Sequence, residues 1–400
     1  MHPVQVFIVV SLILVLISSV SGDSPLQTPD DWKKTRLGSF STLSQDEVNA
    51  VITPVLVNGT YHDMVVVLVD PSGYVVYGYG RPDLTSRPIP DEHALMGLGS
   101  ISKVFTGILA ADAEERALVN LTVPITRYLP GIQVPSLNGR EITLIDLATH
   151  TSGLPAVPDT FGNAADSALI AGDFDAYEDA FAYHTTMQDE EVYSWLSNLT
   201  LTREPGSAWE YSNVGTGIAG DIISRVNNER YEAILSSRVL QPLSMNNTTI
   251  VLSGPIQDQI VPGYRGYSGE KDPARLIEFN DFWASSGGIY STGEDMAVFM
   301  AANLGLVNTT LDSSMKNARI PRYTRATEPI LQEQSLFWDV LNIPNVSVMY
   351  TKSGETNGYQ SHIILDPANK RGALVLADTA YLVGPHVQDQ ATELMKKMTA

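Results

Sequence analysis

The sequence predicts an α+β fold, in which an antiparallel sheet is flanked by N- and C-terminal helices and a mostly helical lobe is inserted into it. The middle of the chain, roughly residues 100–285, reads as short helices and loops broken by proline and glycine. β-rich runs instead gather near the two ends of the chain, at 64–69, 74–79, 349–353, 362–366 and 372–377. Strands from both ends that share one sheet would leave the helical middle as an insertion.

The first elements carry specific local signals. Ser44-Gln45-Asp46-Glu47 precedes a run with Val48, Val51 and Ile52, which is typical of a capped helix start. The two early β-rich runs surround Pro71-Ser72-Gly73, and this turn sequence predicts a hairpin. A helix is expected to open at Ser100, because Ile101, Phe105, Ile108 and Ala111 follow helical spacing.

The last elements are equally readable. The second and third late runs are separated by Pro367-Ala368-Asn369-Lys370, which predicts a turn between two strands. Residues 388–398 predict a closing helix. Ser286-Gly287-Gly288 and Asn357-Gly358 are expected to form tightly packed turns, where glycine permits unusual backbone angles.

The first 22 residues contain no Lys, Arg, Asp or Glu, and 6–20 are almost wholly apolar. That length fits the core of a secretory signal better than a membrane-spanning helix, and Val20-Ser21-Gly22 offers small residues for cleavage. An uncleaved anchor is the alternative, because only His2 and the terminal amine could supply a positive n-region.

We therefore expect a signal peptide at 1–22, a loose polar leader at 23–44, and a single catalytic unit at 45–400. Within that unit we expect an α/β lobe at about 45–98 and 286–400 and a helical lobe at about 99–285. The length exceeds what one hydrophobic core usually organises, which favours two lobes. No internal repeat or low-complexity tract is found.

A secretory route also explains the density of Asn-x-Ser/Thr sequons. The seven candidate glycosylation sites are Asn58, Asn120, Asn198, Asn246, Asn247, Asn308 and Asn345. The chain has no cysteine, so disulfides and thiol chemistry are excluded. We expect a secreted, extracellular protein with no stable membrane association after signal cleavage.

The formal net charge of -20 argues against nucleic acid as a partner, since a phosphate backbone binds basic surfaces. The histidines show no metal-binding spacing such as His-Glu-x-x-His, so no metal site and no cofactor are expected. The expected partner is a small-molecule or short-peptide substrate.

Three short motifs carry the chemistry: Ser100-Ile101-Ser102-Lys103, Tyr211-Ser212-Asn213 and Lys352-Ser353-Gly354. A serine hydroxyl needs a neighbouring base to become a nucleophile, and a lysine three residues further along a helix lies on the same face. Ser-x-x-Lys also occurs at Ser268 and Ser313, but the tyrosine and second lysine motifs each occur once. Together they favour catalysis over a simple helix-capping role for Ser100.

With these motifs the chain resembles the serine β-lactamase and penicillin-binding-protein superfamily, in its class C β-lactamase, D-aminopeptidase and esterase branch. The stretches 144–155, 205–210 and 358–361 also look like those around the motifs of that family. The resemblance runs from about residue 45 to the C-terminus. It implies an acyl-enzyme mechanism on a β-lactamase/transpeptidase-like fold.

The resemblance also implies individual roles. Ser100 would be the nucleophile, Asn213 would orient Lys103 and the acyl group, and Lys352 would supply positive charge beside Tyr211. The backbone N–H groups of Ser100 and Glu355 would form the oxyanion hole. Ser353 and Gly354 would contact the substrate.

The proton acceptor stays open between Lys103 and Tyr211. Burial would lower the pKa of Lys103, whereas two nearby lysines would favour the phenolate form of Tyr211. His150 is a third possible base, but the resemblance makes it a residue that shapes its loop.

The predicted function is a secreted serine hydrolase that acts on an ester, amide or lactam. Neutral esters are favoured, because the third motif continues into Glu355, an acidic residue where many relatives carry a small one. The alternatives are an acyltransferase or transesterase in small-molecule biosynthesis, or a catalytically silent binding protein on the same fold.

Overall fold

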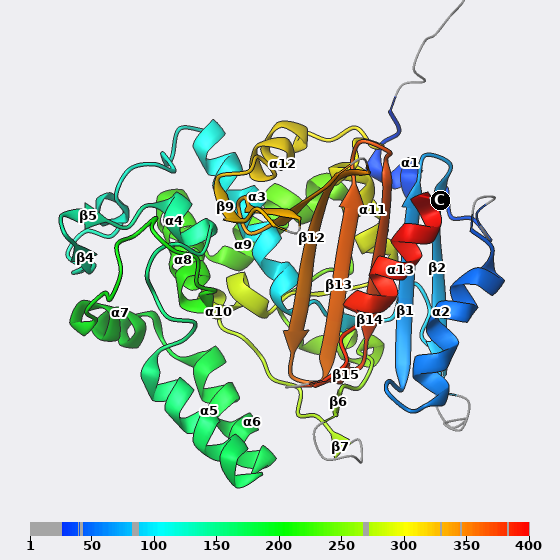
Figure 1. The fold of residues 1–400 in the computed structure, drawn as a ribbon, viewed down its shortest axis with the longest axis horizontal. Coiled ribbons are helices and arrows are strands. Elements are labelled where there is room, and N and C mark those ends of the chain that lie inside the picture. The colour runs from blue at the N-terminus through cyan, green and yellow to red at the C-terminus, as the bar shows by residue number, and fades with distance from the viewer. Residues whose placement is uncertain are drawn as a thin grey trace, which may run out of the picture.

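The computed structural model describes residues 26–38, 40, 43–81, 88–266, 272–328, 330–344, 346–381 and 384–399. Its main feature is a sheet of eight antiparallel strands in the order β2-β1-β14-β13-β12-β11-β10-β9, seen face-on in Figure 1. The strands are β1 (Asp63–Asp70), β2 (Gly73–Gly80), β9 (Tyr323–Ala326), β10 (Leu331–Gln334), β11 (Asp339–Ile343), β12 (Ser347–Thr356), β13 (Tyr359–Asp366) and β14 (Arg371–Ala377). The predicted α+β class is confirmed.

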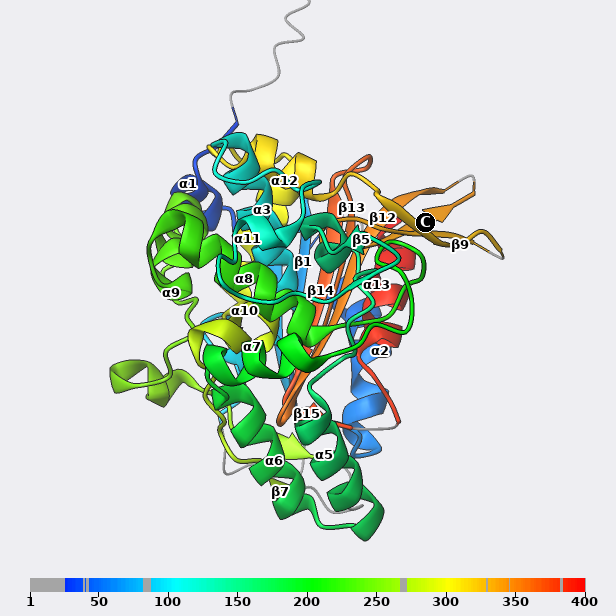
Figure 2. The same ribbon diagram turned by 90° about the vertical axis from the view of Figure 1, so that its left-hand side faces the viewer.

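The terminal helices α2 (Gln45–Val57) and α13 (Gln388–Thr399) cover one face of this sheet (Figure 2). The predicted capping box at the start of α2 is present: the Ser44 side chain accepts from the Glu47 N–H and the Glu47 side chain accepts from the Ser44 N–H. Residues of β1 alternate between the two faces, and all eight are buried. A strand that is buried on both sides reads as a continuous apolar run, which explains why residues 64–69 were so clear in the sequence.

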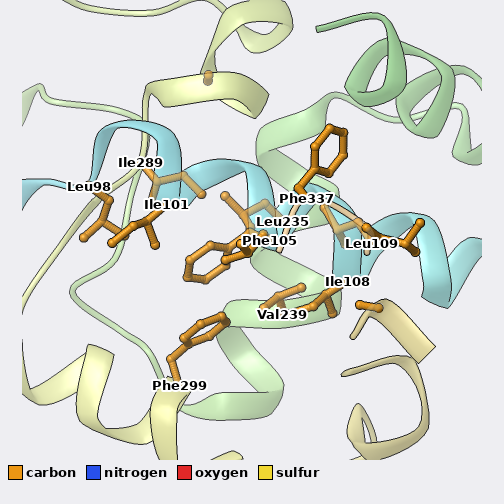
Figure 3. Close-up of a cluster of buried hydrophobic side chains, with 14 of the residues drawn as sticks. Leu98, Ile101, Phe105, Ile108, Leu109, Leu235, Val239, Ile289, Phe299 and Phe337 are labelled. Carbon is orange, nitrogen blue, oxygen red and sulfur yellow. The ribbon is translucent and has the colours of Figure 1, made fainter. Parts of the chain in front are cut away.

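The helices on the opposite face include α3 (Ser102–Glu115), α8 (Asn213–Asn227), α10 (Asp281–Gly287) and α11 (Gly293–Asn303). Helix α11 packs on β1 and β2 and α10 touches β12, while α8 packs on α3 and α10. The rings of Phe105 and Phe299 stack with centroids 4.3 Å apart and join α3 to α11 (Figure 3). Helix α3 is buried almost all round, because α8, α10 and α12 surround it. A helix fixed on all sides holds the motif at its start in one place.

The remaining described elements are shorter or peripheral. The helices are α1 (Pro29–Lys33), α4 (Leu144–Ala148), α5 (Asp159–Ala171), α6 (Phe174–Thr186), α7 (Asp189–Asn198), α9 (Tyr231–Leu235) and α12 (Asp312–Ala318). The short strands are β3 (Met96–Gly97), β4 (Ser136–Leu137), β5 (Arg140–Glu141), β6 (Tyr264–Arg265), β7 (Asp272–Pro273), β8 (Tyr290–Ser291) and β15 (Thr379–Ala380). Short 3-10 or π turns are η1 (Gly99–Ile101), η2 (Ile125–Arg127), η3 (Ser236–Leu240), η4 (Gln241–Leu243) and η5 (Gly254–Gln259). Helices α5 and α6 form a hairpin that projects at the lower left of Figure 1.

Three features differ from the sequence expectations. The leader is not loose in its described part, because Trp32 on α1 is buried and Lys33 pairs with the buried Asp295 at 2.7 Å. Strands β9, β10 and β11, which extend the sheet, were not predicted. Ser100 lies in the 3-10 turn η1, immediately before the α-helix that was expected to open there.

Candidate active site

Turn η1, which carries Ser100, rests directly on strand β12. A Cβ atom on Gly99 would lie 2.5 Å from the Glu355 backbone nitrogen, and a Cβ atom on Gly354 would lie 2.0 Å from the Leu98 carbonyl oxygen. Gly99 also adopts a positive φ of +50°, which glycine permits at little cost. The Ser361 hydroxyl fastens the turn by donating to the Leu98 carbonyl at 2.7 Å. Both glycines are therefore required for the approach that brings Ser100 next to Glu355.

The structure brings the first two motifs together at the Ser100 hydroxyl. Ser100 Oγ lies 3.0 Å from Lys103 Nζ and 2.6 Å from the Tyr211 hydroxyl. Lys103 is one turn further along, and Tyr211 comes from the loop just before α8. A hydroxyl in hydrogen-bond contact with two groups that can take up or relay a proton has the geometry of an activated nucleophile.

Lys103 is completely buried and lies among apolar residues of α3. Burial, followed by the positive charge of Lys352, holds the pKa of Lys103 well below its usual value. Its Nζ also donates to the Ser286 carbonyl at 2.5 Å. A neutral amine fixed in this way keeps its lone pair for the Ser100 proton.

The pKa of the Tyr211 hydroxyl is shifted in the opposite direction to that of Lys103. Burial raises its pKa above the ordinary value of 10, the hydrogen bond to Ser100 lowers it, and the charge of Asp339 raises it. Of the two alternatives that the sequence left open, burial therefore favours the protonated phenol at Tyr211 and the neutral amine at Lys103. Tyr211 donates its proton to Ser100 Oγ, which leaves Lys103 as the group able to accept one.

Lys352 reaches the same place from β12. Its Nζ lies 5.3 Å from the centre of the Tyr211 ring and 3.4 Å from Asp339 Oδ2. The other oxygen of Asp339 pairs with Arg325 at 2.6 Å, and the Arg325 guanidinium lies 3.8 Å from the centre of the Trp209 ring. Asp339 thus offsets part of the Lys352 charge, which agrees with a Tyr211 that stays protonated.

A cavity of about 310 Å³ opens in front of these groups. It is lined by Ser100, Trp209, Tyr211, Arg325, Asp339, Lys352, Ser353, Gly354, Glu355 and His386. All three residues of the third motif line it, together with the serine and the tyrosine. This volume suits a small molecule or the end of a short peptide.

Ser353 and Glu355 form one side of the cavity. Ser353 Oγ lies 2.8 Å from His362 Nδ1, and burial lowers the pKa of His362 to about 3, so the ring is neutral. Gln360 donates to the Glu355 carboxylate at 2.9 Å. Surrounding protein atoms raise the pKa of Glu355 to about 7, although part of the side chain still reaches water, and the bond from Gln360 opposes this shift.

Two polar residues of the motif region do not contact the nucleophile. Asn213 is the first residue of α8, and among the described residues its side-chain amide makes no hydrogen bond to Lys103. The Ser286 carbonyl holds Lys103 instead, a contact that no sequence pattern predicts. His150 is fully buried, and its Nδ1 accepts from the Ser212 N–H at 3.2 Å, so it supports the Tyr211 loop.

Several cavity residues were missed at the sequence level, namely Trp209, Arg325, Asp339 and His386. Arg325 and Asp339 lie on β9 and β11, and only the strand register, with Asp339 opposite Thr351, brings them beside Lys352. Trp209 stands two residues before Tyr211, so its nearness to the second motif was an available signal.

Within the described ranges, no cluster of three or more His, Asp or Glu residues could hold a metal ion. Over the same ranges, no helix combines the length and the apolar character needed to cross a bilayer.

The chain is similar in sequence and in fold to known beta-lactamases and to a D-alanyl-D-alanine-carboxypeptidase/endopeptidase. A family model described as Beta-lactamase matches residues 48–394. A beta-lactamase of Escherichia coli (strain K12) is 26% identical over 372 residues, which cover 84% of this chain and 89% of that protein. The D-alanyl-D-alanine-carboxypeptidase/endopeptidase AmpH of the same strain is 30% identical over 240 residues, or 59% of this chain and 56% of AmpH. A solved class C beta-lactamase superposes with a TM-score of 0.71 at 22% identity, covering 88% of this chain and 95% of that one.

Proposed function

The chain belongs to the beta-lactamase family, and from that premise we propose that it is a serine hydrolase that forms an acyl-enzyme at Ser100. One observation carries the proposal: the Ser100 hydroxyl contacts both Lys103 Nζ and the Tyr211 hydroxyl, at 3.0 and 2.6 Å. These contacts, in a cavity that also holds Lys352, are what an acyl transfer to serine needs.

In the first half of the reaction, Ser100 Oγ forms a bond to the carbonyl carbon of the substrate, and its proton passes to neutral Lys103. The carbonyl oxygen becomes an anion, for which the backbone N–H groups of Ser100 and Glu355 are the proposed donors. As the bond to the leaving group breaks, the Tyr211 hydroxyl gives its proton to that group, and the proton held by Lys103, whose Nζ lies 4.9 Å from the centre of the Tyr211 ring, restores the hydroxyl. Lys352 helps by placing positive charge near the Tyr211 ring.

In the second half, water adds to the acyl carbon and gives its proton to the same relay. The bond to Ser100 breaks, Ser100 Oγ takes the proton back, and the acid is released. The free enzyme is restored, with one ester, amide or lactam bond hydrolysed. An alcohol or amine in place of water would give acyl transfer by the same steps.

For the substrate, we propose that neutral esters are preferred over lactams that carry a carboxylate. The curated relatives are named as a beta-lactamase and a D-alanyl-D-alanine carboxypeptidase, so lactams and amides remain within reach. Two carboxylates of this cavity, Asp339 and Glu355, flank the third motif, however. Their charges oppose a substrate carboxylate, while Lys352 and Arg325 offset part of that effect.

We expect kcat/KM for a p-nitrophenyl ester to exceed that for a chromogenic cephalosporin. The cephalosporin should lose further ground as the pH rises through about 7, because Glu355 gains its negative charge there. Initial rates for both substrates between pH 5 and 9, with product masses to show whether water or an added alcohol took the acyl group, provide the measurement.

The variant Glu355→Gln removes the charge, while Glu355→Gly also removes the side chain, and both keep the backbone N–H. Each should improve the cephalosporin relative to the ester, and the two together separate charge from shape. Faster hydrolysis of the cephalosporin by the wild type would reverse the proposed ranking. No change in either variant would place the Glu355 charge outside the substrate path.

We also propose that the protein is secreted and glycosylated. The apolar start lies outside the described residues, as does the sequon residue Asn345. Five of the remaining six asparagines, Asn58, Asn120, Asn198, Asn246 and Asn308, are exposed, and Asn247 is half-buried. In two sequons the asparagine Oδ1 accepts from the threonine hydroxyl two residues later at 2.7 Å, at Asn58 and at Asn120.

Expressed in a eukaryotic host, the protein should appear in the medium with an N-terminus near Asp23. Enzymatic deglycosylation should lower its mass, since exposed sequons can carry glycans without disturbing the core. Peptide mapping of Asn58→Gln and Asn120→Gln variants should show one glycan fewer in each. Retention in the cytosol with Met1 intact would contradict both proposals.

A further inference from the structure

The tip of the β12–β13 hairpin is held unusually tightly. Gly358 has a φ of +83°, and a Cβ atom there would lie 2.8 Å from Gly263 Cα and 2.9 Å from Ala274 Cβ. The Tyr359 hydroxyl donates to the Val261 carbonyl at 2.5 Å. The tip is thus pressed against a segment of the insertion, although it closes the strand that carries the third motif.

Beside this tip lies a buried carboxylate that the proposed mechanism does not use. Glu178 of α6 accepts from Asn357 Nδ2 at 2.7 Å and from the Arg275 backbone N–H at 3.0 Å, both through Oε1. Its Oε2 lies 3.6 Å from the Arg265 guanidinium. We call Glu178, Arg265, Arg275 and Asn357 the Glu178 node.

The Glu178 node holds Asn357 from one side only. Asn357 Nδ2 donates to Glu178 and to the Arg275 carbonyl, at 2.7 Å each, whereas its buried Oδ1 has no hydrogen-bond partner among the described residues. Glu178 and Asn357 are only 5% and 7% exposed, so water cannot replace a lost contact at small cost. The orientation of Asn357 therefore depends on Glu178 and the Arg275 carbonyl.

Asn357 follows Glu355 by two residues on the same strand end. The Glu355 backbone nitrogen lies against Gly99, next to the nucleophile, and is one of the two proposed oxyanion donors. Tyr177 of α6 lies close enough to Glu355 to feel its charge: burial and then that charge raise the pKa of Tyr177 to about 12. A shift of the tip would consequently move the Glu355 N–H relative to Ser100.

We propose that Glu178 is a positioning residue, which holds the hairpin tip so that the Glu355 N–H points at the developing oxyanion. This inference rests on the proposed acyl-enzyme function. Glu178 lies outside the cavity on α6. It would therefore affect how well the transition state is stabilised, and not how tightly the substrate binds. A misplacement of about 1 Å at such a donor costs on the order of 100-fold in rate.

The test compares Glu178→Ala, Glu178→Gln and the matched control Asp179→Asn. Asp179 is the next residue, is exposed, and pairs at 2.9 Å with the guanidinium of Arg275, not with the Arg275 backbone N–H that Glu178 binds. For each variant, kcat and KM are measured with a p-nitrophenyl ester. The affinity for an aryl boronic acid is measured in parallel, because its tetrahedral adduct with serine places an oxygen in the oxyanion hole.

Glu178→Ala should lower kcat by about 10- to 100-fold, with KM changed by less than about 3-fold. Its affinity for the boronic acid should fall by about the same factor as its kcat/KM. Glu178→Gln should recover most of the loss, since its amide oxygen can still accept from Asn357 and Arg275. Asp179→Asn should behave as the wild type.

A folded Glu178→Ala variant with wild-type kcat would overturn the inference. So would a variant in which KM rises and kcat does not change. If Glu178→Ala does not fold, Asn357→Ala removes the same contact from the other partner, and an unchanged kcat there is equally decisive. A wild type that forms no Ser100 adduct would refute the proposed function. A wild-type adduct with unaffected Glu178 variants would refute only the positioning role.

Discussion

Replacement of Ser100 by alanine is expected to lower turnover by about 10⁴- to 10⁶-fold, the range seen when a serine nucleophile is removed. The hydroxyl is the only group in the proposed mechanism that bonds to the substrate, so its neighbours cannot replace it. The protein should stay folded, because Ser100 lies in a short turn that Gly99, Leu98 and Ser361 fix.

Intact mass after exposure to a fluorophosphonate, together with circular dichroism, measures both expectations. The chain supplies its own matched control in Ser313-Ser314-Met315-Lys316, a second Ser-x-x-Lys sequence on α12. There Ser313 is exposed and Lys316 pairs with Asp312 at 2.7 Å. Ser313→Ala should keep full activity and labelling. Equal labelling of the wild type and Ser100→Ala would disprove the nucleophile assignment.

Removal of the proton relay should be nearly as damaging. Lys103→Met keeps the volume of the buried side chain but loses the lone pair, and Tyr211→Phe keeps the ring but loses the hydroxyl. We expect each to lower kcat by about 10²- to 10⁴-fold, the usual contribution of general acid–base catalysis. The double variant should lose little more than either single one, because the two groups act on one proton.

The low pKa of Lys103 predicts how activity and stability change with pH. The pKa of Lys103 is lower in the folded than in the unfolded state. Activity should therefore be lost in acid, as the amine gains a proton and can no longer accept one from Ser100. Between the two pKa values the unfolded state binds more protons, so stability should rise with pH across that window.

Stopped-flow acylation rates and thermal melts between pH 4 and 10 measure both trends. Lys103→Met should remove the contribution of this amine to the pH dependence of stability. Additive losses in the double variant would show that Lys103 and Tyr211 act in separate steps.

Features that depend on residues close together in the chain could be predicted from the sequence. Ser44 and Glu47, three residues apart, predicted a helix start because the capping box is closed by neighbours. The hairpin of β1 and β2 followed from apolar runs around a turn. The three motifs were found because side-chain type and spacing alone define them.

Other features depended on contacts between distant segments. Strand β10 reads Leu-Gln-Glu-Gln and is half-buried over most of its length, so its residues carry no apolar alternation that could be recognised. Asp339 reaches Lys352 only through the pairing of β11 with β12. The direction of the Tyr211 pKa shift could not be predicted either, because burial and not residue type raises the pKa.

The centre of the main sheet has a consequence for how the chain comes into being. Strand β1 hydrogen-bonds to β14, with Met64 opposite Ala377, so its partner is synthesised about three hundred residues later. Until then the continuous apolar run of β1 has only β2 beside it, and the native core cannot close during synthesis. Completion of the main sheet is therefore expected to follow the synthesis of β14. The net charge of -20 makes partly folded chains repel one another, which opposes aggregation through the uncovered edge of β1.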